Sequence, residues 1–277
     1  MPLSFRSPDA QPTGVEILLR AFELGLTLVD TADVYAPSAN DIGHNERIVG
    51  EAVRLFPSGR DTLRVVTKVG LRRHGNDWWR DSSPEWLLSA AERSVAALGL
   101  VPDMLLLHRV NREQSFAAAI EGLLEARRRG LAKHIGLSNV TLGEFNDAWA
   151  LTGGRVCAVQ NEFSPRCRDQ PEVLRACSER GVPFLAWSPL GGGHEAARLG
   201  ELYPVFGAVA AERGTTPQAV ALAWLRAQGP TVVPIPAFGR FETLEATVAA
   251  SGLTLSPEEM SRLDQSPAGP GSVFPPL

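Results

Sequence analysis

The chain has 277 residues, of which 27 are basic and 31 acidic, so its formal net charge is −4. With 44% hydrophobic and 21% charged residues it has the composition of an ordinary globular protein, which excludes a disordered or collagen-like chain. It has no basic block, no apolar run near the roughly 18 residues that span a bilayer, and no apolar core of a signal peptide. We therefore expect a cytoplasmic protein whose main partner is neither nucleic acid nor membrane.

Two residue types are unusually scarce. Of the 27 basic residues only Lys68 and Lys133 are lysine, and the only tyrosines are Tyr35 and Tyr203. Each therefore raises the question of what its site requires. The three cysteines contain no CxxC pair, so the sequence favours neither a disulfide framework nor a metal site.

Short apolar runs alternate with amphipathic helical stretches along the whole chain. The predicted strands are 26–32, 64–69, 103–109, 133–139, 156–163, 183–190 and 231–236. Capping-box spacings, in which a Ser or Thr precedes a Glu by three residues, predict helix starts at Ser82, Thr141 and Ser256. Strictly alternating strands and helices predict a parallel sheet, either open and doubly wound or closed as a barrel.

The positions of the polar residues distinguish between the open, doubly wound sheet and the closed barrel. A doubly wound nucleotide fold places a GxGxxG motif after its first strand, and LTLVDTADVY has none. A barrel carries its functional residues at the carboxyl ends of many strands. Here the residues that close the predicted strands are Asp30, Lys68, His108, Ser138 with Asn139, Gln160, Trp187 with Ser188, and Pro236.

We therefore predict an α/β fold of the (β/α)8 TIM-barrel type, forming a single domain over residues 1–277. Only seven strands are visible, and the helical stretch 15–24 is preceded only by MPLSF. We interpret Met1 to Phe5 as the tail of a truncated first strand, because an open barrel would expose an unpaired edge.

Three of the residues that close the predicted strands, together with a nearby tyrosine, suit carbonyl reduction. A tyrosine hydroxyl can act as the proton donor if a lysine ammonium beside it lowers its pKa, and a carboxylate can anchor that lysine. Asp30, Tyr35, Lys68 and His108 supply these types at three successive strand ends. We assign Tyr35 as general acid, Lys68 as its activator, Asp30 as the partner of Lys68, and His108 as the group that orients the carbonyl oxygen. We refer to these four residues as the tetrad.

The motifs DTADVY, VVTKVG, LLLHR, HIGLSN, VQNEFS and AWSPLGGG, in this order, resemble the aldo-keto reductases, which are NAD(P)H-dependent (β/α)8 barrels. The resemblance implies that the tetrad is catalytic. It also implies that Ser138, Asn139 and Gln160 hold the nicotinamide carboxamide and that Trp187 stacks on the nicotinamide ring. Ser188, Leu190, Gly191 and Pro236 would line the cofactor path, where backbone N–H groups can approach phosphate.

Two departures from the family pattern concern specificity. Ala36 replaces the usual Gly after the catalytic tyrosine and is followed by a longer loop that borders the substrate pocket. After the last strand only Arg240 remains as a phosphate ligand for the adenosine end, so NADPH is the expected cofactor and NADH the alternative. The stretch VVTKVGLRRHGNDWW is similar to the pyridoxal-reductase-like branch, and Trp78, Trp79 and Trp86 within or just after it are candidate pocket walls.

The predicted activity is that of an NADP-dependent oxidoreductase that reduces an aldehyde or ketone to an alcohol by hydride transfer, in a reversible direction. The alternative is a cofactor-binding barrel that serves as a redox sensor or regulatory subunit with little turnover. An intact tetrad favours the enzyme. Lys133 lies at the opposite end of its strand from the tetrad, so we expect a structural role for it, and Tyr203 has no predicted partner.

Overall fold

The computed structural model describes residues 2–5, 11–56, 60–75 and 77–274. The chain divides into two compact units, Met1–Ala158 with Phe238–Phe241, and Val159–Ala237 with Glu242–Pro276. The prediction of a single domain over residues 1–277 stays a prediction. No described helix is both long enough and apolar enough to cross a membrane.

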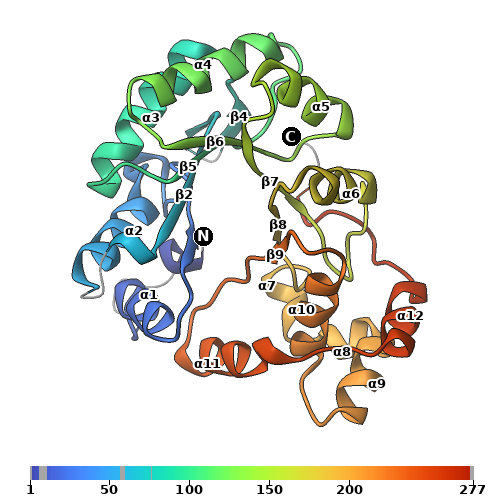
Figure 1. Cartoon of the computed structure of the whole chain (residues 1–277). Coiled ribbons are helices and arrows are strands. Elements are labelled where there is room, and N and C mark those ends of the chain that lie inside the picture. The colour runs from blue at the N-terminus through green and yellow to red at the C-terminus, as the bar shows by residue number, and fades with distance from the viewer. Residues whose placement is uncertain (1, 6–10, 57–59, 76, 275–277) are drawn as a thin grey trace. The chain divides into compact units, whose positions relative to one another are not determined.

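The first unit contains four parallel strands in the order β1, β2, β5 and β6. Their bounds are Leu28–Asp30, Arg64–Val69, Met104–Leu107 and His134–Ser138. The helices of this unit are α1 (Gly14–Glu23), α2 (His44–Leu55), α3 (Pro84–Leu98), α4 (Phe116–Arg128) and α5 (Leu142–Leu151). In Figure 1 these helices lie along the outer side of the strands. Short 3-10 turns occupy Pro2–Ser4, Ala39–Asp41 and Arg60–Thr62.

The segment Pro2–Ser4 corrects one detail of the prediction. The sequence predicts a strand tail over Met1 to Phe5, but Pro2–Ser4 forms a 3-10 turn. Met1 itself lies outside the described residues. Ser4 is buried and its hydroxyl accepts a hydrogen bond from the Asn45 side chain at 2.8 Å. The segment therefore packs on the start of α2 through side-chain contacts instead of pairing with β1.

The core of the first unit lies between its helices and its strands. Phe22 from α1, Val49 and Val53 from α2, and Val29 and Val65 from the strands form one buried cluster. Burying such side chains stabilises the fold by about 1.5–3 kcal/mol each. The same cluster explains the apolar periodicity of α1 and α2, because the residues that repeat at helical spacing are those that face the sheet.

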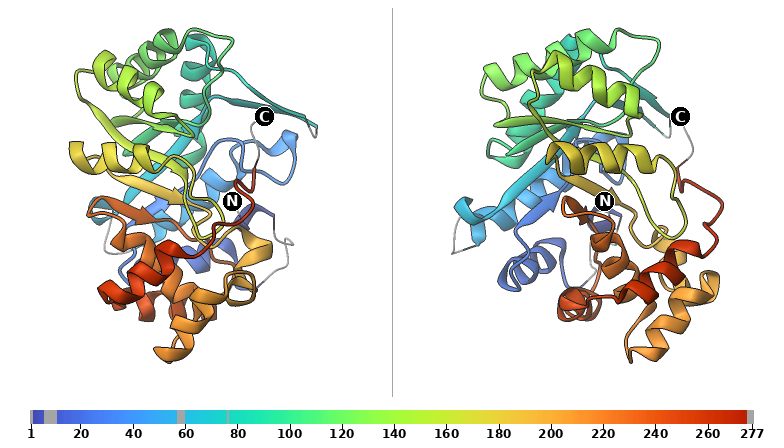
Figure 2. Two further views of the ribbon diagram at one scale, coloured as in Figure 1. Left: turned by 90° about the vertical axis from the view of Figure 1, so that its right-hand side faces the viewer. Right: turned by 45° about the vertical axis from the view of Figure 1, so that its right-hand side comes forward.

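A two-stranded antiparallel hairpin follows β2, formed by β3 (Leu71–His74) and β4 (Asp77–Arg80). None of the predicted strands covers this stretch. Figure 2 shows the hairpin extending away from the parallel strands of this unit. Its cross-strand pairs place Trp78 opposite Arg73 and Trp79 opposite Arg72. Cation–π contact holds Arg73 at 4.8 Å from the Trp78 ring.

The second unit contains the parallel strands β7 (Val156–Glu162, which enters from the first unit), β8 (Phe184–Trp187) and β9 (Val232–Pro234). Its helices are α6 (Pro171–Arg180), α7 (Gly193–Ala196), α8 (Leu199–Leu202), α9 (Pro204–Glu212), α10 (Pro217–Ala227), α11 (Phe241–Ala249) and α12 (Pro257–Gln265), with a 3-10 turn at Ala250–Gly252. Trp224 of α10 is fully buried, stacks on Phe163 and donates its indole N–H to Asp264 at 2.7 Å.

The first residues of the helices test the three predicted capping boxes. Capping boxes are present at Thr141 with Glu144 and at Ser256 with Glu259, as predicted. The box predicted at Ser82 is wrong, because α3 begins after Ser83, which makes no side-chain cap bond. Ser82 instead accepts a hydrogen bond from the Asn111 backbone N–H at 3.0 Å. A tertiary contact therefore replaces the local one.

Candidate active site

The tetrad comes together at the carboxyl ends of three neighbouring parallel strands of the first unit. Asp30 ends β1, Lys68 lies near the end of β2, and His108 directly follows β5. Because β2 pairs with both β1 and β5, the three strand ends are adjacent. Tyr35 follows β1 by five residues, and its ring meets that of His108 edge to face, with the centroids 5.7 Å apart.

Lys68 is the centre of this arrangement. It is fully buried, and its ammonium donates to the Asp30 carboxylate at 2.7 Å and to the backbone carbonyl of Thr31 at 2.6 Å. The ammonium lies 4.9 Å from the centroid of the Tyr35 ring. A buried ammonium without partners would be very costly, so these acceptors are what allow the charge to stay in the core. The Thr31 carbonyl was not predicted, because a backbone acceptor leaves no signal in the residue types.

The electrostatics of Lys68 keep it charged. Burial by itself lowers the pKa of Lys68, but the Asp30 carboxylate and the Tyr35 hydroxyl outweigh it, and the net pKa lies above the ordinary value of 10.5. The ammonium is therefore present throughout the neutral range. It can act on Tyr35 as a permanent positive charge.

The pKa of Tyr35 differs in direction from the sequence-based expectation. Burial raises the pKa of the Tyr35 hydroxyl above 10.0, and this effect outweighs the lowering by Lys68, while Asp30 raises it further. The Lys68 charge therefore lowers the pKa of Tyr35, as expected, but the net pKa still lies above its ordinary value. The hydroxyl remains protonated at neutral pH, which is the state that a proton donor needs.

His108 is held neutral. Burial, together with the positive charges of Lys68 and Arg109, places the pKa of His108 well below its ordinary value of 6.5. Its Nδ1 is buried and has no hydrogen-bond partner among the described residues. A neutral imidazole carries one N–H donor, so His108 can hydrogen bond to a carbonyl oxygen without adding charge.

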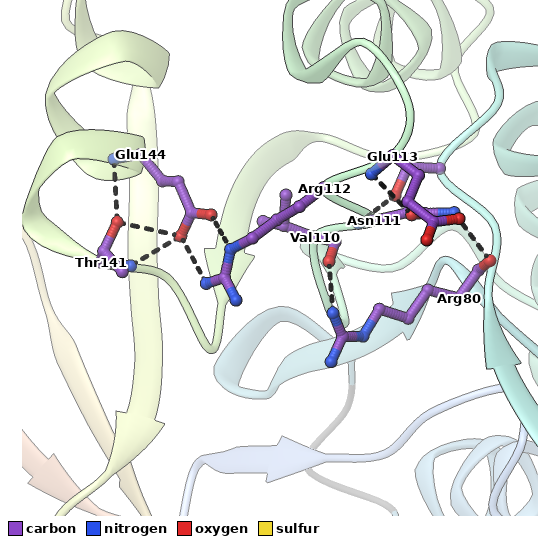
Figure 3. Close-up of polar contacts among 8 residues, drawn as sticks. Arg80, Val110, Asn111, Arg112, Glu113, Thr141 and Glu144 are labelled. Atoms are coloured by element: carbon purple, nitrogen blue, oxygen red, sulfur yellow. Dashed lines mark hydrogen bonds and ion pairs between the residues drawn. The ribbon is translucent and has the colours of Figure 1, made fainter. Parts of the chain in front are cut away.

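The loop after His108 forms hydrogen bonds with the segments on both sides of it (Figure 3). Arg80 at the end of the hairpin donates to the Val110 carbonyl at 3.3 Å, and the Asn111 side chain donates to the Arg80 carbonyl at 3.1 Å. Arg112 donates to Glu144, the capping residue of α5, at 3.0 Å. The hairpin and the start of α5 therefore fix the backbone that follows His108.

The first unit also contains three of the predicted cofactor residues, Ser138, Asn139 and Arg240. Asn139 adopts a positive φ of 57°, and its amide donates to the His108 carbonyl and to the Ser138 hydroxyl, both at 3.0 Å. This pair is therefore joined to the tetrad through the His108 backbone. Arg240 is exposed.

The second unit contains the remaining predicted cofactor residues. Gln160 is buried within β7, Trp187 ends β8 half-buried, Leu190 is half-buried, and Pro236 follows β9. The loop after Trp187 has a positive φ of 47° at Ser188 and of 79° at Gly191. The Gly191 N–H donates to the Ser188 carbonyl at 2.9 Å, so these residues close a turn.

The three tryptophans predicted as pocket walls have different surroundings in the structure. Trp78 packs with Tyr35 against the buried residues Ala32, Val34 and Leu71. Trp86 is instead stacked between two guanidinium groups, with Arg72 at 4.0 Å and Arg93 at 4.5 Å. Trp78 and Tyr35 therefore pack on the same buried residues, whereas Trp79 and Trp86 line a cavity of this unit together with Arg72.

Within the described residues there is no cluster of three side chains that could hold a metal ion. The arrangement of the tetrad suits proton transfer at a carbonyl oxygen, since it combines a protonated phenol, a fixed ammonium and a neutral imidazole. The tetrad lies at the carboxyl ends of neighbouring parallel strands, which is the edge that carries the active site in α/β-barrel enzymes.

Comparison with known proteins identifies the family. The model of the aldo/keto reductase family matches residues 10–267, and the chain belongs to this family. Pyridoxine 4-dehydrogenase of Escherichia coli is 34% identical over 274 residues, covering 95% of this chain and 90% of that protein. An uncharacterised oxidoreductase of Schizosaccharomyces pombe is 29% identical over 260 residues, covering 93% of this chain and 80% of that protein.

Solved structures agree with this assignment. A thermostable aldo-keto reductase in complex with the inhibitor epalrestat matches with a TM-score of 0.75 and 30% identity, over 90% of this chain and 85% of that one. An aldo-keto reductase from Klebsiella pneumoniae in complex with NADP and acetate matches with a TM-score of 0.74 and 26% identity, over 91% of this chain and 83% of that one. The predicted (β/α)8-barrel fold class is thereby confirmed, and the protein is an oxidoreductase of this family.

Proposed function

We propose that this protein reduces an aldehyde or ketone to the corresponding alcohol with NADPH as cofactor, and that Tyr35 is the general acid. The convergence of Asp30, Tyr35 and His108 around the fully buried Lys68 carries the proposal. NADPH is chosen over NADH because Arg240 suits the adenosine phosphate and because a related structure contains NADP.

Each member of the tetrad has a separate task. Tyr35 donates its hydroxyl proton to the carbonyl oxygen as that oxygen gains negative charge. Lys68 stabilises the resulting phenolate, and Asp30 holds the ammonium in place. Neutral His108 donates a hydrogen bond to the same oxygen and so orients the carbonyl group.

When bound, the reduced nicotinamide would supply the hydride. Ser138, Asn139 and Gln160 would hold its carboxamide, and Trp187 would support the ring. The loop of Ser188, Leu190 and Gly191, with Pro236 and Arg240, would hold the phosphates. Gly191 and Gly192 support this assignment, because residues without a side chain let the backbone approach a ligand closely.

The test follows the loss of reduced-cofactor absorbance with NADPH and with NADH, using a panel of aliphatic aldehydes, aromatic aldehydes, ketones and pyridoxal. Pyridoxal belongs in the panel because pyridoxine 4-dehydrogenase of Escherichia coli is a relative at 34% identity. We expect Tyr35→Phe to lower kcat by about 10²- to 10⁴-fold while cofactor affinity is retained. Tyr203→Phe, which removes the other tyrosine hydroxyl, is the matched control and should retain turnover.

Two results would contradict the proposal. If Tyr35→Phe turned over as fast as the parent, Tyr35 would not be the acid. If the parent bound cofactor tightly but reduced no carbonyl in the panel, the redox-sensing alternative would replace the enzyme.

A further inference from the structure

Two adjacent residues of α2, Asn45 and Glu46, contact the neighbours of the catalytic residues in the chain. Both are almost completely buried, with exposures of 2% and 1%. Neither is needed to cap the helix in the usual way, because Gly43 occupies the cap position and makes no side-chain cap bond. Polar side chains so deep in the core cost free energy unless their hydrogen bonds serve the structure around them.

Asn45 contacts the strand that leads to Tyr35. Its side-chain oxygen accepts a hydrogen bond from the Thr31 hydroxyl at 2.9 Å, and its backbone N–H donates to the Tyr35 carbonyl at 3.1 Å. The backbone carbonyl of Thr31 is the group that binds the Lys68 ammonium at 2.6 Å. Asn45 therefore holds both ends of the segment between Thr31 and Tyr35.

Glu46 makes the corresponding contact on the next strand. Its carboxyl group accepts a hydrogen bond from the Thr67 hydroxyl at 2.6 Å, and Thr67 directly precedes Lys68 in β2. Thr31 and Thr67 are both fully buried. Because side chains alternate along a strand, the Thr67 hydroxyl faces α2 while the Lys68 side chain extends to the opposite face, toward Asp30.

We infer that Asn45 and Glu46 are positioning residues for the Lys68–Tyr35 pair, acting through the hydroxyls of Thr31 and Thr67. The inference rests on the proposed function, since the purpose of the positioning is proton donation by Tyr35. Neither residue touches the reacting atoms. Displacing a catalytic group by about 1 Å through a remote substitution can lower the rate about 10²-fold, so such contacts matter for the reaction.

The scarcity of lysine provides a direct spectroscopic test. In protein labelled with ¹⁵N only at lysine, Lys133→Arg leaves Lys68 as the only source of a side-chain ammonium signal. Buried and bonded to two acceptors, Lys68 should give an ammonium resonance whose protons exchange slowly with water. The variants Thr31→Val and Thr67→Val each remove one hydroxyl while keeping the shape of the side chain.

We expect the resonance to shift and its protons to exchange several-fold faster in Thr31→Val and Thr67→Val. The variants Thr31→Ser and Thr67→Ser, which restore the hydroxyl, should return both properties to the parent values. In parallel, kcat should fall about 10- to 100-fold in each valine variant, with cofactor affinity unchanged. Thr152→Val is the matched control, because Thr152 is a buried threonine that bonds only near the end of α5.

If Thr31→Val fails to fold, Asn45→Ser gives the same test, because it withdraws the acceptor of Thr31 and keeps the backbone N–H. An ammonium signal unchanged in the variants, or an equal response in Thr152→Val, would overturn the inference. The spectroscopic result does not depend on turnover. A shifted signal in a protein that reduces no carbonyl would leave the positioning intact and reject the proposed function instead.

Discussion

The two lysines of this chain form ion pairs of the same composition in very different surroundings. Lys68 binds Asp30 at 2.7 Å with its side chain 1% exposed, and Lys133 binds Asp103 at 2.9 Å with its side chain 55% exposed. Lys68 lies near the carboxyl end of its strand, and Lys133 directly precedes the amino end of β6. The distances are almost equal, so the two lysines differ in burial and in position on the strand, and not in the pairing.

The largest expected difference is in turnover. Replacing Lys68 by Met removes the charge beside Tyr35, and we expect kcat to fall about 10³-fold or more, because the phenolate formed after proton transfer loses its partner. Lys133→Met should keep the parent kcat. Steady-state kinetics of both variants measures the contrast. Equal kcat values for the two would mean that burial does not distinguish the lysines.

A smaller change is expected on replacing the carboxylate partners. Asp30→Asn withdraws the charge that raises the pKa of Lys68, so the ammonium loses its proton at lower pH. The alkaline decline of kcat should therefore begin at lower pH than in the parent, and kcat at neutral pH should fall about tenfold. Asp103→Asn affects a carboxyl that accepts the Val65 backbone N–H at 2.8 Å, so it should change stability and leave the pH profile as it is.

The parent pH profile gives a third contrast. The pKa of Tyr35 is raised, so the proton donor is lost only above its ordinary value of 10.0. The pKa of His108 lies well below 6.5, so its protonation does not affect the rate near neutrality. We expect kcat for reduction to stay level from about pH 6 to pH 9. A decline centred near pH 6.5 would show that His108 titrates normally and is less buried in solution.

The smallest effect concerns stability at the exposed pair. An ion pair with an exposed lysine contributes about 0–1 kcal/mol, so Lys133→Ala should lower the free energy of unfolding by no more than that. Because exposed charges are screened by salt, the difference from the parent should shrink further at high ionic strength. Denaturant unfolding at low and high salt measures it. A loss of several kcal/mol would indicate that Asp103 depends on Lys133 for its burial.

Local sequence signals predicted local structure well. The capping boxes at Thr141 and Ser256 form as expected, because both partners lie within one helical turn. The box at Ser82 fails because Asn111 and Gln114, about thirty positions away, bind Ser82 instead. The hairpin of β3 and β4 was missed because its strands are short and rich in Arg and Trp, so they lack the alternation that marks a strand.

The sequence by itself determined where the strands lie along the chain and which polar residues follow their apolar runs. Side-chain periodicity and strand ends are local properties of the chain. It therefore predicted Asp30, Tyr35, Lys68 and His108 as one group, and the structure brings them together. Their catalytic role stays a prediction until it is measured. Scarcity also drew attention to Lys68 and Tyr35, which lie together in the structure. The structure gives the other two residues partners, Asp103 for Lys133 and Glu195 for Tyr203.

Only the tertiary structure decided the electrostatics of the site. The sign of the Tyr35 pKa shift depends on the balance between burial and the charge of Lys68, and burial is a sum over residues from many elements. Only the tertiary structure likewise revealed the hydrogen bonds made by the Thr31 carbonyl, Asn45 and Glu46. A backbone acceptor has no residue type, and a contact between α2 and a strand end exists only once the helix has packed on the sheet.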